Sequence, residues 1–109
     1  MPFDENLANR MRVLLDQKVK LSEKRMFGGI GFLLNGNLVC GVQNQNVIAR
    51  IGPDNYASAL EKPFTKPFDM TGRPMAGWVE VLPEGAVSDT DLMVWLQMSL
   101  DFAATLLPK

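Results

Sequence analysis

Short polar turns divide the middle of the chain into apolar runs, and this pattern limits the folds that the sequence can adopt. Residues 25–34 and 38–43 are rich in Phe, Val and Leu, and an Asn-Gly-Asn turn at residues 35–37 joins them. Asparagine and glycine tolerate positive φ, so this turn predicts a β-hairpin. A second polar turn at residues 44–46 leads into a third apolar run at residues 47–51. The three runs therefore predict an antiparallel meander.

Helical signals flank this meander on both sides. Apolar residues recur every three or four positions over residues 5–19, behind Asp4 as the N-cap. Pro53 suits the first turn of a second helix. Ser88 opens a third helix, in which Asp91 completes an acidic variant of the capping box. The sequence therefore predicts helices at the start, in the middle and at the end of the chain.

A second pair of extended segments lies between the last two predicted helices. Residues 68–70 and 77–82 lie before and after residues 71–74, and we expect them to pair as another hairpin. The sequence Asp-Met-Thr-Gly-Arg-Pro at residues 69–74 is typical of a turn. Together the elements predict an α+β fold, a two-layer antiparallel sheet of about five strands with helices, in the order α-β-β-β-α-β-β-α. A length of 109 residues favours a single domain over residues 1–109.

The chain has no histidine and one cysteine, Cys40. The absence of histidine removes Ser-His and Cys-His nucleophile pairs and the usual general base. A lone cysteine cannot form an intrachain disulfide or a thiolate zinc cage. Cys40 lies in a predicted central strand, where we expect a buried core thiol. We therefore predict no enzymatic activity, no catalytic residue, no cofactor and no metal site.

Targeting and membrane-spanning segments are not indicated by the sequence. Its longest apolar runs are far shorter than the roughly 20 residues that a transmembrane helix needs. The N-terminus, Met-Pro-Phe-Asp-Glu-Asn, lacks the basic start and the apolar region of a signal peptide. We therefore expect a cytoplasmic protein without membrane contact.

Charge is unevenly distributed, although the formal net charge is −1. Residues 1–75 hold ten basic and seven acidic side chains, whereas residues 76–109 hold one basic and five acidic ones. Six basic residues form a candidate basic stripe near the start: Arg10, Arg12, Lys18, Lys20, Lys24 and Arg25. This stripe is a candidate nucleic-acid interface, and the alternative is the solvated face of a helix and its following loop. The acidic C-terminal third argues against a dedicated nucleic-acid-binding protein.

Arg50, Arg73 and Trp78 form a candidate site for a small anion or ligand. Arg50 is a charge inside an otherwise apolar strand, and Asp69 and Glu80 are its candidate structural partners. Arg73 lies in the second hairpin turn, where its guanidinium can clamp an anion while Trp78 offers a stacking face. The alternative interpretation is a plain turn, whose shape is set by its Asp, Gly and Pro residues.

The last helix is apolar around more of its circumference than a surface helix needs. One face is formed by Leu92, Trp95, Leu96, Ser99, Phe102, Ala103 and Leu106. Met93, Leu100 and Leu107 lie off this face at heptad spacing. The helix therefore sits in a wide groove or packs against a second chain, and we predict a homodimer through these three residues.

Six short segments share their order and spacing with one known family. They are Arg-Met-Phe-Gly-Gly-Ile-Gly-Phe at 25–32, Asn-Gly at 35–36, Cys-Gly-Val at 40–42, Arg-Ile-Gly-Pro at 50–53, Pro-Phe-Asp-Met-Thr-Gly-Arg-Pro-Met at 67–75 and Gly-Trp-Val at 77–79. In this combination the chain resembles the N-terminal domain of the TfoX/Sxy family of bacterial competence regulators. The resemblance extends over almost the whole chain and implies the same small α+β domain.

Full-length members of that family carry a second, C-terminal helical domain and act as coactivators with the cyclic-AMP receptor protein at competence promoters. This chain stops at Lys109, so we expect the first domain alone. The resemblance implies a non-enzymatic regulatory or protein-interaction module, which we expect to self-associate and to have a protein partner in transcription regulation. A domain that binds nucleic acid or a small anion is the alternative.

Overall fold

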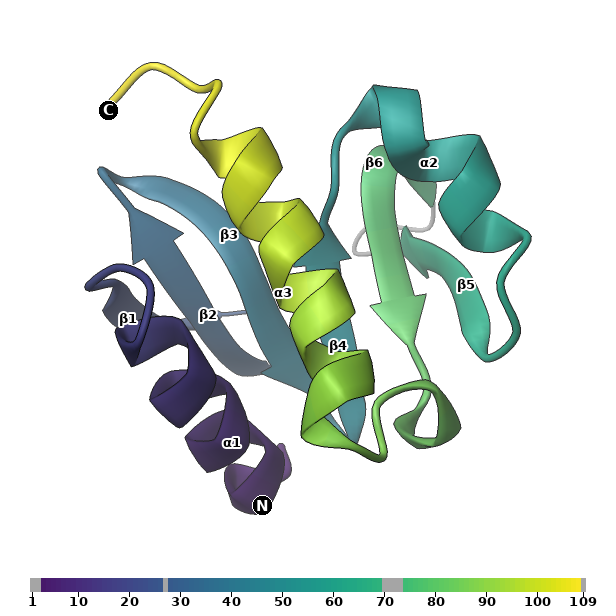
Figure 1. Ribbon diagram of the computed structural model, residues 1–109, viewed down its shortest axis with the longest axis horizontal. Coiled ribbons are helices and arrows are strands. Elements are labelled where there is room, and N and C mark those ends of the chain that lie inside the picture. Colours follow the sequence, from purple (N-terminus) through teal and green to yellow (C-terminus); the bar gives the residue numbers. More distant parts are fainter. Residues whose placement is uncertain (1–2, 27, 70–73, 109) are drawn as a thin grey trace.

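The computed structural model describes residues 3–26, 28–69 and 74–108, and this part of the chain forms three α-helices and six β-strands (Figure 1). The helices are α1 (Glu5–Asp16), α2 (Pro53–Leu60) and α3 (Asp89–Ala103). The strands are β1 (Ser22–Met26), β2 (Gly29–Leu34), β3 (Asn37–Gln43), β4 (Asn46–Arg50), β5 (Thr65–Asp69) and β6 (Pro74–Val81). A 3₁₀ turn, η1 (Pro83–Gly85), precedes α3. The predicted α+β class is confirmed.

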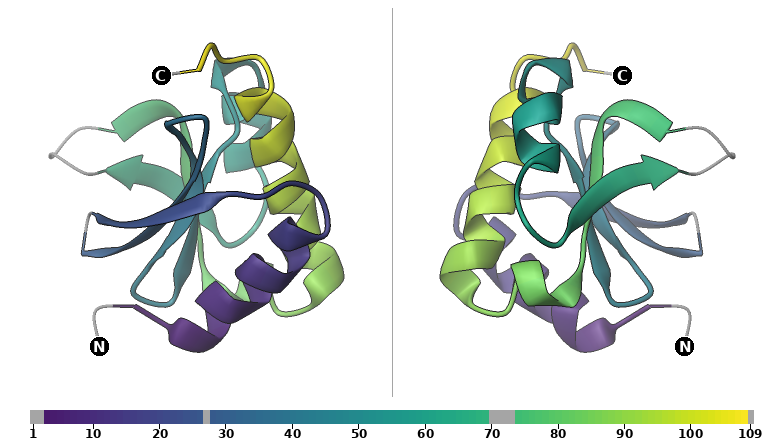
Figure 2. Two further views of the ribbon diagram at one scale, coloured as in Figure 1. Left: turned by 90° about the vertical axis from the view of Figure 1, so that its left-hand side faces the viewer. Right: turned by 90° about the vertical axis from the view of Figure 1, so that its right-hand side faces the viewer.

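The six strands form one antiparallel sheet in the order β1-β2-β3-β4-β6-β5. The β2–β3 and β3–β4 pairs confirm the predicted meander, and β5 and β6 pair as the predicted second hairpin. β6 lies beside β4, with Trp78 opposite Arg50 and Glu80 opposite Ile48. The three helices lie on one side of the sheet, so the fold has two layers (Figure 2).

The first strand of the sheet is the main difference from the sequence prediction. Residues 25–34 do not form a single strand, because the chain turns at Gly28, whose φ is +72°, and the segment before the turn is the separate strand β1. The sheet therefore has six strands, in the element order α-β-β-β-β-α-β-β-η-α. Most side chains of β1 are polar and exposed, so no apolar pattern indicated a strand there.

Both predicted side-chain caps are present. The Asp4 carboxylate accepts hydrogen bonds from two amides in the first turn of α1, and the Ser88 hydroxyl accepts one from the amide of Asp91. These bonds satisfy amides that have no partner within their own helix. α1 ends at Asp16, before the predicted end at residue 19. Among the described residues, none of the helices is long and apolar enough to span a membrane.

The main hydrophobic core lies between the helices and the sheet. Met11 and Leu15 of α1 and Leu96 of α3 are buried there against strand residues such as Val79. Cys40 belongs to the same core, as predicted. Burial raises the pKa of its thiol, because the ionised form would lose its hydration. The thiol is therefore held neutral in the folded protein.

A second, smaller apolar cluster lies on the sheet face opposite the helices. Ile48 and Phe68 are fully buried, yet neither belongs to the main core. Alternate residues of a strand share a face, so Arg50 lies on the same side as Ile48. The ring centroids of Phe68 and Trp78 are 6.1 Å apart. We call Ile48, Arg50, Phe68 and Trp78 the far-face cluster.

Candidate interaction surfaces

Arg50, one of the three residues of the predicted ligand site, lies between two aromatic rings. Its guanidinium carbon is 5.1 Å from the ring centroid of Trp78 and 5.5 Å from that of Phe102. Its Nη1 also lies 3.4 Å from the carbonyl oxygen of Leu38 and donates to it. Each cation–π contact of this kind contributes about 0.5–1 kcal/mol at an exposed site. The structure thus brings Arg50 and Trp78 together, and Phe102 of α3 joins them.

Two glycines allow Phe102 to approach Arg50. Gly52 follows β4 with a φ of +89°, and a Cβ atom there would lie 2.5 Å from the Phe102 ring. Gly77 has a φ of +90°, and a Cβ atom there would lie 3.1 Å from the carbonyl carbon of Gly52. A larger residue at Gly52 would both strain the backbone and push the end of α3 away from β4. The glycine pair therefore sets the spacing of the cation and its rings.

Arg50 forms no ion pair within residues 3–26, 28–69 and 74–108. The cross-sheet ion pairs with Asp69 or Glu80 that the sequence suggested do not form, because Arg50 lies over the rings and Glu80 accepts a hydrogen bond from the Asn46 side chain. Desolvation lowers the pKa of the Arg50 guanidinium. Rings and a backbone carbonyl, rather than a carboxylate, hold this cation. Arg73, the third residue of the predicted site, lies outside the described residues.

The six residues of the basic stripe do not form one continuous charged face. Arg10 donates from Nε to Asp89 at 3.1 Å and from Nη2 to the carbonyl of Val87. Arg12 donates two hydrogen bonds to Glu23, at 2.6 and 2.9 Å, and these raise the pKa of Arg12. Two members of the stripe are therefore ion-paired within the domain, which weakens the nucleic-acid interpretation.

The other four basic residues gather at one edge of the sheet. Lys18 and Lys20 lie between α1 and β1, and Lys24 and Arg25 lie in β1 itself. All four are exposed. The Arg25 guanidinium carbon is 5.4 Å from the ring centroid of Phe3. The stripe is thus divided into two paired arginines on α1 and four cations around the β1 edge.

The three apolar residues predicted to face a second chain lie apart in the structure. Leu100 is 8% exposed and packs into the core, so it offers no interface. Leu107 is 85% exposed, but it follows the end of α3, where helical spacing no longer applies. Met93 is half-buried beside α1. The three residues therefore do not make one surface, because the helix ends before the third and turns the second inward.

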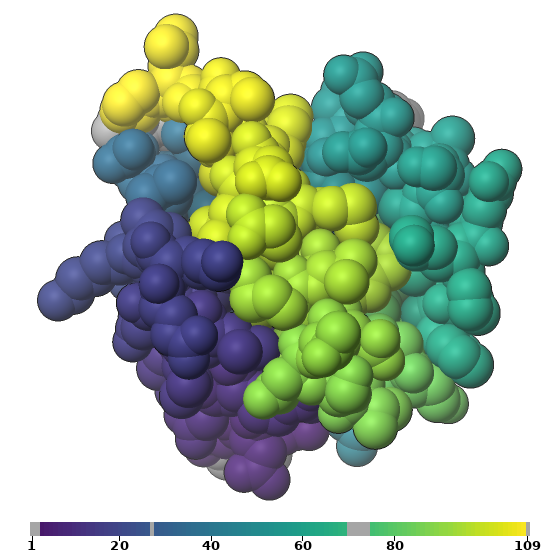
Figure 3. All heavy atoms as spheres, viewed as in Figure 1, coloured from purple at the N-terminus to yellow at the C-terminus, as the bar shows by residue number. Residues whose placement is uncertain are grey.

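An exposed apolar band crosses α3 at a different place. Val94 is 47% exposed and lies between two hollows. The hollow toward α1 has a volume of about 500 Å³ and is lined by Leu14 and Met93. The hollow on the other side, of about 290 Å³, is lined by Phe64 and Trp95. We call Leu14, Phe64, Met93 and Val94 the α3 band. Figure 3 shows the face of the molecule on which α3 lies between α1 and α2.

Sequence reasoning named only Met93 of this band as an interaction residue; it missed Leu14, Phe64 and Val94. Val94 lies in a helix that is apolar over a wide arc, and periodicity alone does not tell which part of such an arc stays uncovered. Phe64 is 47% exposed and has a φ of +64°, which is unfavourable for a bulky side chain. The signal that could have identified Phe64 is its position directly after a proline, in a segment without a helical or strand pattern.

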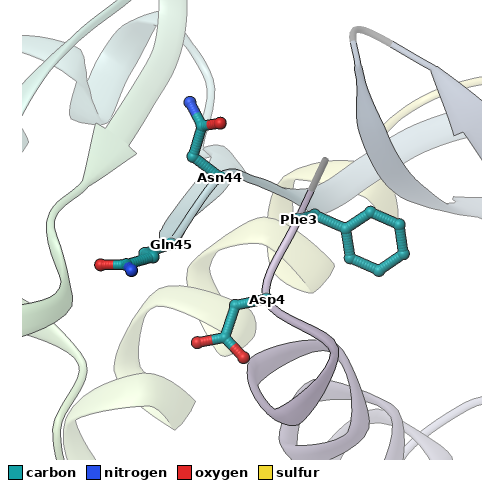
Figure 4. A pocket seen from close by; sticks show the side chains of 4 residues that line it. All are labelled: Phe3, Asp4, Asn44 and Gln45. Carbon is teal, nitrogen blue, oxygen red and sulfur yellow. The ribbon is translucent and has the colours of Figure 1, made fainter. Parts of the chain in front are cut away.

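A polar hollow of about 280 Å³ lies where the N-terminal segment meets the turn between β3 and β4 (Figure 4). It is lined by Phe3, Asp4, Asn44 and Gln45. The Asp4 amide donates to the carbonyl of Asn44 at 2.7 Å, and the Asp4 carboxylate caps α1. Its polar groups anchor the start of the chain, so we assign this hollow to the fold rather than to a ligand.

The comparison with protein families identifies a known domain over most of the chain. Residues 14–103 match the family model of the TfoX N-terminal domain. The chain belongs to the TfoX N-terminal domain family. The matched segment of this TfoX N-terminal domain runs from within α1 to the last residue of α3, and it includes the whole sheet. Comparisons with curated proteins and with solved structures gave no match. Membership in the family is consistent with a competence-regulator-like module.

Proposed function

We propose that this TfoX N-terminal domain is a non-enzymatic regulatory module that self-associates through the α3 band. The observation that carries the proposal is the band itself, in which Phe64 and Val94 are each 47% exposed beside two hollows. Single exposed apolar residues are ordinary, whereas a contiguous set around hollows is typical of a surface that becomes buried on association. The family match supports the regulatory part of the proposal.

Charges at the rim of the band favour a second copy as the occupant. Lys62, Glu84 and Asp91 all line the hollow beside Phe64. A two-fold contact brings the same surface of two copies together. A rim that carries both signs of charge then lets Lys62 of one copy face a carboxylate of the other. An apolar centre with such a rim is the usual composition of a protein interface.

The first prediction tests the band by placing a charge at its centre. Val94→Glu would bury an unpaired carboxylate in the proposed interface, so we expect self-association to weaken by at least about tenfold. Sedimentation velocity over a concentration series measures the association constant directly. Circular dichroism of the same samples checks that the variant is folded.

The matched control is Val87→Glu, because Val87 is 72% exposed and lies outside the band. We expect Val87→Glu to associate like the unmodified protein. Leu107→Glu tests the surface that the sequence alone suggested, and it should also leave association unchanged. A protein that stays monomeric at all concentrations, or equal effects of Val94→Glu and Val87→Glu, would contradict self-association through the band.

A further inference from the structure

The two edges of the sheet differ in their protection against an additional strand. β5 contains Pro67, which has no amide hydrogen to donate, and the register of the β5–β6 pair shifts between Pro67 and Asp69. β1, at the opposite edge, contains no proline and pairs with β2 in unbroken register from Ser22 to Met26. Proline, irregular pairing and charged side chains, above all lysine, are the usual means by which an edge resists strand addition. β1 lacks the first two and carries only the third, in Glu23, Lys24 and Arg25.

The outer edge of β1 is open to an incoming strand. β1 is the terminal strand of the sheet, and in the left view of Figure 2 it is the strand nearest the viewer. Four of its five side chains are exposed. No strand pairs with its outer edge in the part of the chain that the structure describes. The backbone groups that point away from β2 are therefore available for pairing.

Charge around this edge selects the chemistry of the added strand. Residues 17–26 hold four basic side chains and a single acidic one, Glu23. Glu23 is already bound by Arg12 through two hydrogen bonds. Lys24 forms no ion pair within the described residues, and Arg25 packs on an aromatic ring without a carboxylate partner there. The edge thus carries positive charge that the described part of the chain leaves unneutralised.

A hollow beside β1 provides room for side chains of an added strand. It has a volume of about 300 Å³ and is lined by three cations, Arg12, Lys24 and Arg25, and by two carboxylates, Glu5 and Glu23. Alternate side chains of an added strand point to the same side of the sheet. A carboxylate at such a position meets a hollow in which cations are in excess.

We propose that β1 is the docking edge for an extended acidic segment of a partner protein, which adds to the sheet as a further strand. Main-chain hydrogen bonds to β1 supply affinity, and Lys24 and Arg25, which alternate between the two faces of the sheet, attract carboxylate side chains on either face of the added strand. The residues of this edge are not those of the α3 band. Either proposal, strand addition at β1 or self-association through the α3 band, can therefore be wrong while the other is correct.

The second prediction uses a peptide of alternating glutamate and valine, eight residues long and blocked at both ends, as the probe. Titration into the ¹⁵N-labelled full chain should shift the amide resonances of Ser22–Met26 and leave those of Thr65–Asp69 unchanged. The same peptide with N-methylated amides at alternate positions cannot complete the strand pairing, so it should not bind. A lysine-valine peptide should not bind either, because it meets like charge.

Charge reversal at the two edges gives a matched pair of variants. The double variant Lys24→Glu with Arg25→Glu should weaken binding of the glutamate-valine peptide by about tenfold or more. Lys66→Glu on β5 changes the same kind of exposed side chain at the protected edge, so it should leave binding within about twofold. All positions are exposed, and both proteins should remain folded.

Four results would overturn the proposal. They are no binding of the probe, shifts centred outside β1, equal binding of the N-methylated peptide, and equal effects of the two charge reversals. Shifts of β1 amides that depend on protein concentration without peptide would assign the edge to a second copy instead.

Discussion

The two faces of the sheet bury apolar side chains by different means. On the helix side, Ala49 and Val79 lie opposite each other and pack into the main core beneath the helices. On the other side, Ile48 and Phe68 are equally buried, although the helices lie on the opposite face (Figure 2). Helices cover the first face, whereas the second is buried without a helix lying over it.

Arg50 shows how the second face is closed. Its guanidinium contacts one ring from β6, Trp78, and one from α3, Phe102, so the cation connects the far-face cluster with the helix layer. A long basic side chain can cover apolar surface with its stem while its charge remains partly hydrated. Residues 47–49 are all buried instead of alternating between core and solvent, because both faces of β4 are covered.

The third prediction compares large-to-small substitutions on the two faces. Leu96→Ala on the helix side and Phe68→Ala on the far side each remove a fully buried side chain, and each should reduce the free energy of unfolding by about 3 kcal/mol or more. Urea denaturation of the two variants measures both losses of free energy, provided that the m values equal that of the unmodified protein. A cost below about 1 kcal/mol for Phe68→Ala would mean that the far-face cluster is not packed like a core.

The fourth prediction separates the charge of Arg50 from its apolar stem. Arg50→Met keeps much of the stem and removes the cation, so we expect a loss of about 1 kcal/mol from the two ring contacts. Arg50→Ala also removes the stem and should cost about 2 kcal/mol. An Arg50→Met variant as stable as the unmodified protein would show that the stem alone closes the far face.

Arg10→Met is the matched control for this pair. Arg10 bonds to Asp89 at the surface, where the two side chains are 33% and 67% exposed. Exposed ion pairs contribute little, so Arg10→Met should change the free energy of unfolding by less than about 0.5 kcal/mol. A larger loss at Arg10 than at Arg50 would reverse the ranking of the two cations.

Much of the fold could be predicted from the sequence because its signals are local. The turn at residues 35–37 and the caps Asp4 and Ser88 act within a few residues, and each is where the sequence placed it. β1 could not be predicted, because an exposed edge strand of mostly polar residues has no apolar periodicity. The strand forms because β2 offers it pairing groups, which is a tertiary cause.

The candidate surfaces were less predictable, because each depends on which elements meet. Arg50 and Trp78 stood out as polar and aromatic residues in strands, but the contribution of Phe102 depends on where α3 ends. Leu100 and Val94 both belong to a widely apolar helix. The packing of α3 on β3 and β4, rather than helical spacing, buries the first and exposes the second.

The fifth prediction concerns Cys40 and the exclusion of water from the helix-side core. The folded protein holds the thiol neutral, since burial raises its pKa, whereas the thiol of the unfolded chain ionises near pH 8.5. Ionisation therefore favours the unfolded state as the pH rises, and the stability difference between the unmodified protein and Cys40→Ala should shrink by about 0.8 kcal/mol between pH 7 and pH 9.

Urea denaturation of both proteins under reducing conditions measures this difference in the free energy of unfolding. The two proteins share all other titratable groups, so the effect of those groups on stability drops out of the comparison. Among the described residues, the helix-side core around Cys40 contains no cation that would stabilise a thiolate. The thiol therefore ionises only when the protein unfolds. A thiol reagent should accordingly modify Cys40 no faster than the protein unfolds. Modification of the folded protein at the rate of a free thiol would show that solvent reaches the helix-side core. The proposed difference between this face and the far face, where the partly hydrated Arg50 lies, would then be wrong.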